Sequence, residues 1–268
     1  QPQGSGPAVF ALPGVGGNVL SYRELSRALG QQQPFHAVEA IGLDGATPPP
    51  DSVEATAQAN LAAIRAIQPQ GPYRLVGHSY GGVVAYEMAR SLLAQGERVD
   101  YLALLDAATP EVLFGADAVA GDEAEDMRRL CAELAEQNGR SFDLSADALR
   151  AMPVDEVLAQ LEKLGIPVDR ARYEVLTAVF RANRDAYRRY RPAPLPRPVD
   201  LHLFRAIRSM PDAGGWPGDY GWNAVAGRAP AIHDIDADHH SILRGAAASA
   251  IAGTLAQRVT GEAPETAH

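Results

Sequence analysis

Short apolar runs alternate with amphipathic segments along the first part of the chain. The apolar runs have the length of buried strands and are bounded by Gly, Pro or polar residues. They are residues 8–12, 35–40, 73–76 and 99–105. The helix-like segments between them are residues 22–29, 53–67 and 82–95. Strands that alternate with helices predict the α/β class, with a mostly parallel central sheet flanked by helices.

A long helical segment interrupts this alternation. Over about residues 110–191 the sequence is charged and helical, with no clear strand. Such a block between strands is typical of an insertion over the sheet, a lid. The proline-rich stretch 192–198 closes it as a stiff connector. Strand-like runs return at 199–204 and 231–235, and a final helix is expected over 246–259.

The composition fits one large domain. With 268 residues, of which 46% are hydrophobic, the chain can bury a substantial core. We expect a single domain over residues 1–268, in which 1–7 and 260–268 are a linker and a loose tail. The polar start without an initiator Met predicts a domain of a longer protein.

Charge, hydropathy and cysteine content argue against several classes of function. A net charge of −9 disfavours a nucleic-acid partner, and no apolar run is long enough to span a bilayer. The polar start does not predict a signal peptide, and the single cysteine, Cys131, cannot form an internal disulfide. We therefore expect a cytoplasmic protein with no membrane partner. The histidines lack metal-ligand spacing with Cys131, so no metal site is expected, and Cys131 itself is interpreted as a small buried residue.

The pentapeptide Gly77-His78-Ser79-Tyr80-Gly81 is the most informative motif. It fits G-x-S-x-G, the nucleophile elbow, with a strand-like run before it and a helix after it. A serine hydroxyl is a weak nucleophile and must stand exposed beside a base. A sharp strand-to-helix turn exposes it, and the flanking glycines let the backbone pass. An ordinary Gly–Ser turn is the alternative, but the context favours Ser79 as a nucleophile.

Two aspartates are candidates for the acid that would orient a catalytic base. In a parallel sheet, catalytic groups gather at the carboxyl ends of the strands. Asp106 follows the apolar run 102–105, on the strand after the elbow. Asp212 is the rival, in the loop after the strand-like run 199–204. An ordinary aspartate that begins a turn is the other interpretation of Asp106.

Three histidines near the end of the chain are candidates for the base. His233 lies within a strand-like run and is interpreted as structural. His239 and His240 follow in a loop, with the apolar step Ile242-Leu243 behind them, and His239 is favoured. An unperturbed imidazole has a pKa of about 6.5, so it can accept the serine proton at neutral pH.

Two further features allow more than one interpretation. The loop 13–17 lacks the last glycine of a dinucleotide fingerprint, because Val19 stands there, but it suits a second oxyanion donor beside the backbone N–H of Tyr80. A plain strand–helix turn is the alternative. The arginines of the last insertion helix form either a solvated face or a seat for an acidic partner or a phosphate. They are Arg181, Arg184, Arg188, Arg189 and Arg191.

Several segments resemble, in the same order, the type I thioesterase domains that end polyketide synthases and non-ribosomal peptide synthetases. These segments are Phe10–Asn18 with Tyr22–Leu25, Tyr73–Gly82, Leu104–Asp106, and Asp238-His239 with Ser241–Leu243. The resemblance covers nearly the whole chain, and the elbow and histidine segments are specific together. It implies the α/β-hydrolase fold with a helical lid insertion, although the lid varies within the family.

The resemblance also implies a set of site residues. It implies a Ser79–His239–Asp106 triad, with Asp106 preferred to Asp212. His240 stands where the family often has an aromatic residue, which supports His239 as the base. The family's position for the second oxyanion donor falls on the backbone N–H of Val15.

The substrate follows from the same resemblance. In this family a serine takes an acyl chain from the phosphopantetheine thioester of a carrier protein, and water or an internal nucleophile releases it. The resemblance therefore implies a terminal thioesterase with no bound cofactor and an upstream acyl or peptidyl carrier protein as partner. A free-standing editing thioesterase and a non-catalytic acyl-binding or docking module on the same fold are the alternatives. Apolar insertion residues are expected to pack the lid or face the chain: Leu130, Leu134, Leu158, Leu161, Leu176 and Phe180.

Overall fold

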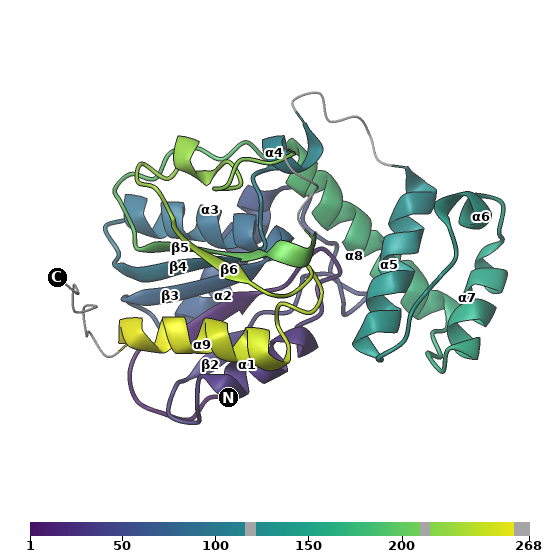
Figure 1. Ribbon diagram of the computed structural model, residues 1–268, viewed down its shortest axis with the longest axis horizontal. Coiled ribbons are helices and arrows are strands. Elements are labelled where there is room, and N and C mark those ends of the chain that lie inside the picture. Colours follow the sequence, from purple (N-terminus) through teal and green to yellow (C-terminus); the bar gives the residue numbers. More distant parts are fainter. Residues whose placement is uncertain (116–121, 210–214, 260–268) are drawn as a thin grey trace.

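The computed structural model describes residues 1–115, 122–209 and 215–259, and six strands in this part of the chain form one sheet (Figure 1). All neighbouring strands are parallel, and the order across the sheet is β2-β1-β3-β4-β5-β6. The strands are β1 (Val9–Leu12), β2 (Phe35–Ala37), β3 (Tyr73–His78), β4 (Val99–Leu105), β5 (Leu201–Ala206) and β6 (Ala231–Ile235). The predicted parallel sheet is thus confirmed.

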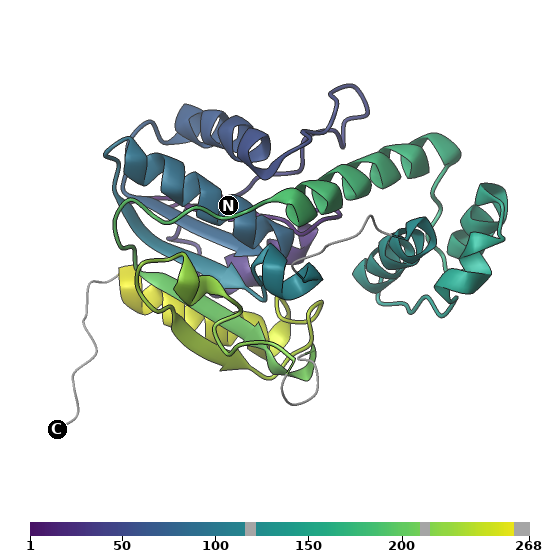
Figure 2. The ribbon, with the colours of Figure 1, turned by 90° about the horizontal axis from the view of Figure 1, so that it is seen from above.

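Helices cover both faces of the sheet (Figures 1 and 2). On one face α1 (Arg23–Ala28) contacts α9 (Gly245–Val259), and on the other α2 (Val53–Ile67) contacts α3 (Tyr80–Ala94). The start of α2 is fixed by Ser52, whose hydroxyl accepts a hydrogen bond from the Ala55 N–H. Because both faces of the central strands β1, β3, β4 and β5 are buried, these strands are apolar along most of their length, whereas the edge strand β6 alternates exposed and less exposed residues.

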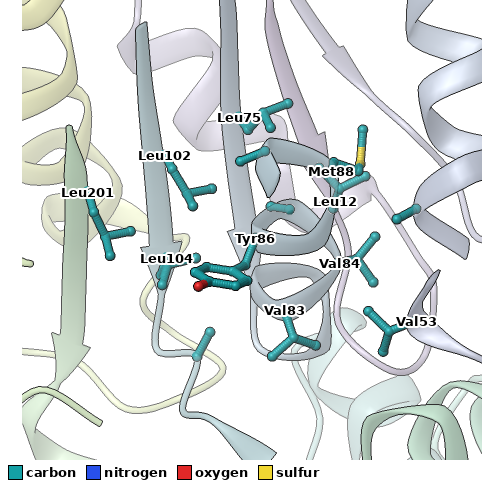
Figure 3. Close-up of a cluster of buried hydrophobic side chains, with 14 of the residues drawn as sticks. Leu12, Val53, Leu75, Val83, Val84, Tyr86, Met88, Leu102, Leu104 and Leu201 are labelled. Atoms are coloured by element: carbon teal, nitrogen blue, oxygen red, sulfur yellow. The ribbon is translucent and has the colours of Figure 1, made fainter. Parts of the chain in front are cut away.

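A cluster of buried apolar side chains lies between α3 and the sheet (Figure 3). Figure 3 shows side chains of this helix directed at the apolar side chains of neighbouring strands. Val83, Tyr86 and Met88 are fully buried there, as are Leu75 and Leu104 from the sheet. This packing holds α3, and hence its first residue, rigidly against the end of β3.

Five helices of the described residues lie between β4 and β5. They are α4 (Pro110–Phe114), α5 (Glu123–Gln137), α6 (Ala146–Arg150), α7 (Val154–Lys163) and α8 (Arg170–Arg189), and we call this segment the helical insertion. Both ribbon views place α5, α6 and α7 together to one side of the sheet, while α8 runs back to it (Figures 1 and 2). Tyr173 and Phe180 of α8 belong to the insertion's own core, whereas Ala186 and Tyr187 belong to the core beneath α3. The long helix α8 therefore ties the insertion to the sheet.

The strand register brings three loops to one edge. Leu12 pairs with Gly77, and His78 pairs with Leu105, so β1, β3 and β4 end almost level. Ser79 and Asp106 each follow the last residue of their strand, and the glycine loop 13–17 follows β1. Parallel strands thus bring all three to the carboxyl edge of the sheet.

Some expected features differ or lie outside the described residues. The sequence pattern did not indicate α6, and β3 extends two residues beyond the predicted run, to His78. Gln1 is hydrogen-bonded to the β2 edge, where its carbonyl accepts from the Phe35 N–H at 2.8 Å. Asp212 and the predicted tail 260–268 fall outside the described residues. The helices in the described ranges include none with the length and apolar character needed to cross a bilayer.

Candidate active site

Ser79 occupies a sharp turn between β3 and α3. Its backbone has φ 54° and ψ −123°, a conformation that non-glycine residues rarely adopt. Two hydrogen bonds hold the turn: the Ser79 N–H donates to the Leu105 carbonyl at 3.0 Å, and the Ser79 carbonyl accepts from the Gly82 N–H at 2.9 Å. The side chain is thereby turned out of the sheet at the start of a helix, as a nucleophile elbow requires.

Both flanking glycines are sterically required. A Cβ on Gly77 would lie 2.1 Å from the Gly81 carbonyl oxygen, and one on Gly81 would lie 2.0 Å from the Leu12 carbonyl oxygen. Such contacts are impossible without moving the backbone. The two outer positions of the G-x-S-x-G motif are therefore fixed by the close approach of β1, β3 and α3.

Asp106 and His239 are in direct contact. The His239 Nδ1 lies 2.6 Å from Asp106 Oδ2. The other carboxylate oxygen, Oδ1, accepts from the Ala206 N–H at 3.0 Å and from the Tyr220 hydroxyl at 3.2 Å. The His239 backbone N–H donates to the Ser209 hydroxyl at 2.6 Å. Asp106 is thus held through both of its carboxylate oxygens, and His239 is held through its ring and its backbone N–H.

The environment keeps Asp106 ionised. Burial alone would raise the pKa of this carboxyl, but the hydrogen bond from His239, its positive charge when protonated, and the Ala206 N–H together hold the pKa below its ordinary value. An ionised carboxylate only accepts hydrogen bonds, so His239 Nδ1 carries the proton. The Nε2 of His239 is then left with a lone pair that can accept a proton.

His78, inside the elbow motif, links the elbow to the histidine loop. Its Nε2 lies 2.8 Å from the His239 carbonyl oxygen, and the two rings are 4.7 Å apart. Burial, together with the charge of the neighbouring His239, lowers the pKa of His78 to about 3. The ring is therefore neutral, with the Nε2 proton donated to the carbonyl. Sequence reasoning missed this contact, because the two residues meet only in the folded chain.

The rival candidates lie elsewhere. His240 Nδ1 is 3.1 Å from a Glu136 carboxylate oxygen, and burial, with the charge of His239, lowers its pKa to about 4. His233 is on β6, where it hydrogen-bonds His202 at 2.9 Å and stacks on Phe204. The structure therefore brings His239, and neither of the other two histidines, to Asp106.

Two backbone N–H groups border the serine. Tyr80 is the first residue of α3, and the first four N–H groups of a helix have no partner within it. The glycine loop is closed by a hydrogen bond from the Gly17 N–H to the Gly14 carbonyl at 2.9 Å, which leaves out the Val15 N–H. Asn183 of α8 donates its amide to the Val15 carbonyl at 2.8 Å and so fixes this peptide segment.

Two cavities meet at Ser79. The larger has a volume of about 470 Å³ and extends toward the insertion, with Phe114, Phe180 and Tyr187 in its wall. The smaller, about 80 Å³, has hydrogen-bonding side chains in its wall, among them Asn18, Ser21 and Gln137. The residues common to both are Val15, Ser79, Glu133, Glu136, His239 and His240. A ligand can thus extend in two directions from the serine.

Most of the apolar insertion residues that the sequence singled out pack in the insertion's own core and do not line this cavity. Of the six that were expected to pack the insertion or line a chain site, Phe180 lines the larger cavity. The other five pack in the insertion's own core: Leu130, Leu134, Leu158, Leu161 and Leu176. Phe114, Trp216 and Glu133 line the cavity but were not singled out from the sequence, because no local pattern marks them.

The arginines of α8 have partners within the chain. Arg181 pairs with Glu123, Arg184 pairs with Asp126 and Asp185, and Arg188 lies over the Phe114 ring. Arg189 donates to the Asp51 carbonyl, and Arg191 donates to the carbonyls of Arg188 and Tyr190. These contacts favour a mainly structural role for the cluster.

Cys131 is buried, and burial raises the pKa of its thiol to about 12, which opposes reactivity.

Comparison with known proteins decides the family. The family model described as a thioesterase domain matches residues 7–259. The chain belongs to the thioesterase domain family. Indigoidine synthase from Streptomyces lavendulae is 28% identical over 252 residues, which cover 90% of this chain and 19% of that protein. The domain therefore spans about a fifth of the length of this relative.

Solved structures agree with this assignment. A four-domain non-ribosomal peptide synthetase, AB3403, is similar with a TM-score of 0.85 and 25% identity, over 97% of this domain and 20% of that chain. The NocB thioesterase domain, in covalent complex with a fluorophosphonate nocardicin G analogue, has a TM-score of 0.69 and 20% identity, each chain being 96% covered. The predicted α/β-hydrolase fold is thus confirmed.

Among residues 1–115, 122–209 and 215–259, no group of three or more His, Cys, Asp or Glu side chains is arranged to hold a metal ion.

Proposed function

We propose that this thioesterase domain releases an acyl or peptidyl chain from the phosphopantetheine thioester of a carrier protein, through an acyl-enzyme on Ser79. The observation that carries the proposal is the 2.6 Å contact between Asp106 and His239, beside a cavity that Ser79 also lines. Membership of the thioesterase family supports a thioester as the substrate. The strained elbow at Ser79 supports a serine nucleophile.

In the proposed acylation step, His239 Nε2 accepts the Ser79 hydroxyl proton while Oγ bonds to the thioester carbonyl carbon. The N–H groups of Tyr80 and Val15 stabilise the negative charge on the carbonyl oxygen. The carbon–sulfur bond then breaks, and His239 gives its proton to the departing thiolate. Asp106 stabilises the imidazolium that exists between these transfers.

Deacylation uses the same groups with a second nucleophile. His239 accepts a proton from water, or from a hydroxyl or amine of the bound chain, as that group attacks the ester carbon. The Ser79 oxygen leaves and regains its proton from His239. Water gives a free acid, and an internal nucleophile gives a macrocycle. Which product forms depends on which nucleophile reaches the ester, and therefore on the wall of the larger cavity.

The two cavities suggest how the substrate would enter. The larger cavity has room and aromatic side chains for an acyl chain, whereas the smaller cavity offers hydrogen-bonding side chains to a pantetheine arm. Similarity to multidomain synthetases supports an upstream carrier domain as the partner and the cytoplasm as the site of action. The reaction as proposed needs no bound cofactor.

Turnover of a pantetheine thioester tests the proposal. Wild-type protein should release free thiol and an acid or a cyclic product, and a fluorophosphonate probe should label it at Ser79. Ser79→Ala should do neither while it keeps its fold. If the wild-type protein were neither labelled nor active on any acyl or peptidyl thioester, a non-catalytic acyl-binding module would be the better account.

A further inference from the structure

Glu133 lies where the two cavities meet. It belongs to α5 and, like Ser79 and His239, lines both cavities. Its carboxylate lies against the glycine loop, since a Cβ on Gly16 would be 2.3 and 2.4 Å from the two oxygens. The carboxyl group therefore lies beside the glycine loop, at the junction of the two cavities that Ser79 lines.

This carboxylate lacks a cationic partner. Among the described residues its hydrogen-bond donor is the Gln137 side-chain amide, at 3.3 Å, and no Lys or Arg forms an ion pair with it. Arg244, in the wall of the smaller cavity, donates to the Glu136 backbone carbonyl. The arginines that line the larger cavity pair with other acids. Arg128 and Arg129 pair with Glu125, and Arg184 pairs with Asp126 and Asp185. Glu133 is thus an acid near the serine that no described Lys or Arg side chain pairs with.

Withdrawal from water disfavours the charged form of the Glu133 carboxyl group. It raises the pKa of Glu133 to about 7; the charge of His239 opposes the rise and Glu136 adds to it. A carboxylate that is partly withdrawn from water is stabilised when a cation with hydrogen-bond donors arrives, since the pair recovers part of the lost hydration. An ammonium group is such a cation, and it is compact enough to fit beside the glycine loop.

We propose that Glu133 binds a protonated amine on the acyl chain, within a few bonds of the thioester carbonyl. The domain then prefers chains with a free α- or β-amino group or a short amino side chain. This inference rests on the proposed function, because it assumes that the carbonyl sits at Ser79. The rest of the chain extends into the larger cavity, past Phe114 and Phe180.

Matched thioesters test this preference. The substrates are pantetheine thioesters of equal chain length with a 3-amino group, a 3-acetamido group, a 3-methyl group, or an amino group at the far end. At pH 8 the wild-type protein should favour the 3-amino chain over the 3-acetamido and 3-methyl chains by about tenfold or more in kcat/KM, as a charged hydrogen bond provides. The far-end amine should gain no such preference.

Glu133→Gln keeps the shape of the side chain and removes its charge. This variant should lose about tenfold on the 3-amino chain, keep its rate on the 3-methyl chain, and be labelled at Ser79 by a fluorophosphonate probe as fast as wild type. Glu136→Gln is the matched control, because Glu136 lies on the same helix and lines the same cavities. It should keep the preference for the amine.

Several results would overturn the inference while the proposed function stands. These are a wild-type protein without preference for the 3-amino chain, an equal gain from the far-end amine, or a Glu133→Gln variant with unchanged preference. Binding to Ser79→Ala protein gives a readout that needs no turnover. There, Glu133→Gln should weaken the 3-amino thioester about tenfold and leave the 3-acetamido thioester unchanged; equal affinities in both proteins would contradict the proposal.

Discussion

At the scale of single residues, Ser79 and Asp106 share an uncommon backbone conformation. Their φ values are 54° and 47°, and each follows the last residue of a buried strand. Such conformations cost on the order of 1–3 kcal/mol and persist only where the surroundings fix them. Here hydrogen bonds from the neighbouring strands do so: the Ser79 N–H donates to Leu105, and the Asp106 N–H donates to Phe204 at 2.7 Å. Both side chains are thereby turned toward the same cavity.

Asp106→Asn should lower kcat by about 10²–10⁴, because an amide in place of the carboxylate can fix the wrong tautomer of His239 and cannot stabilise its charge. Steady-state turnover of one thioester measures the loss. Asp147→Asn is the control, since Asp147 pairs with Arg150 at the surface of α6 and should keep wild-type turnover. A loss of less than threefold at Asp106 would contradict its assignment as the acid.

His239→Ala should be nearly inactive, while His240→Ala should keep much of its activity, because Asp106 contacts the first ring and Glu136 contacts the second. The same turnover assay, with circular dichroism to show that both variants fold, decides the order. The reverse ranking would move the base to His240.

Part of the site could be predicted from the sequence, namely the residues whose immediate neighbours in the chain form a recognisable pattern. Ser79 was marked by a local motif, and Asp106 by the end of an apolar run. His239 was favoured over His240 from its loop, the family resemblance supported that choice, and its role stays a prediction. The supporting groups Tyr220 and Ser209 come from distant loops without a local signal, so only the fold brings them to Asp106 and His239.

At the scale of elements, the helical insertion closes the site through α5 and α8. The last turn of α5 contacts the body of the domain at Asn18 through Gln137 and at His240 through Glu136. A last insertion helix was expected from the sequence and is observed as the 20-residue α8, because many turns repeat the pattern. The five-residue α6 was missed, since so short a helix shows no periodicity.

The insertion should set the preference for the acyl chain. Phe114→Ala and Phe180→Ala enlarge the larger cavity and should shift the chain-length preference or the ratio of acid to cyclic product, while a small probe still labels Ser79. Competition between thioesters of different length, read by mass spectrometry, measures the shift. Phe142→Ala is the control, because Phe142 packs in the insertion core and does not line the cavity. An unchanged preference in both cavity variants would make the insertion only a cover.

At the scale of the whole molecule, two half-buried groups, His78 and Glu133, couple folding to pH in opposite directions. The pKa of His78 is lowered to about 3, so below about pH 6.5 the unfolded chain binds more protons and stability falls as the pH falls. The pKa of Glu133 is raised to about 7, so from about pH 4.5 to 7 the folded chain keeps a proton that the unfolded chain loses. Its contribution therefore falls as the pH rises through that window.

Glu133→Gln should accordingly gain stability relative to wild type as the pH rises from 5 to 7.5. Urea unfolding at a series of pH values gives the free energy of unfolding of both proteins. Their difference should grow by at most about 1.4 kcal/mol per pH unit, the limit for one proton. Parallel curves for the two proteins would mean that Glu133 titrates normally in the folded chain.

The central claim is that Ser79 carries the acyl chain, and intact-protein mass spectrometry tests it most directly. After brief exposure to an acyl pantetheine thioester, the wild-type domain should gain the mass of the acyl group, and peptide mapping should assign that mass to Ser79. Ser79→Ala should gain none under the same conditions. An adduct of equal amount on Ser79→Ala, at Cys131 or elsewhere, would contradict the account.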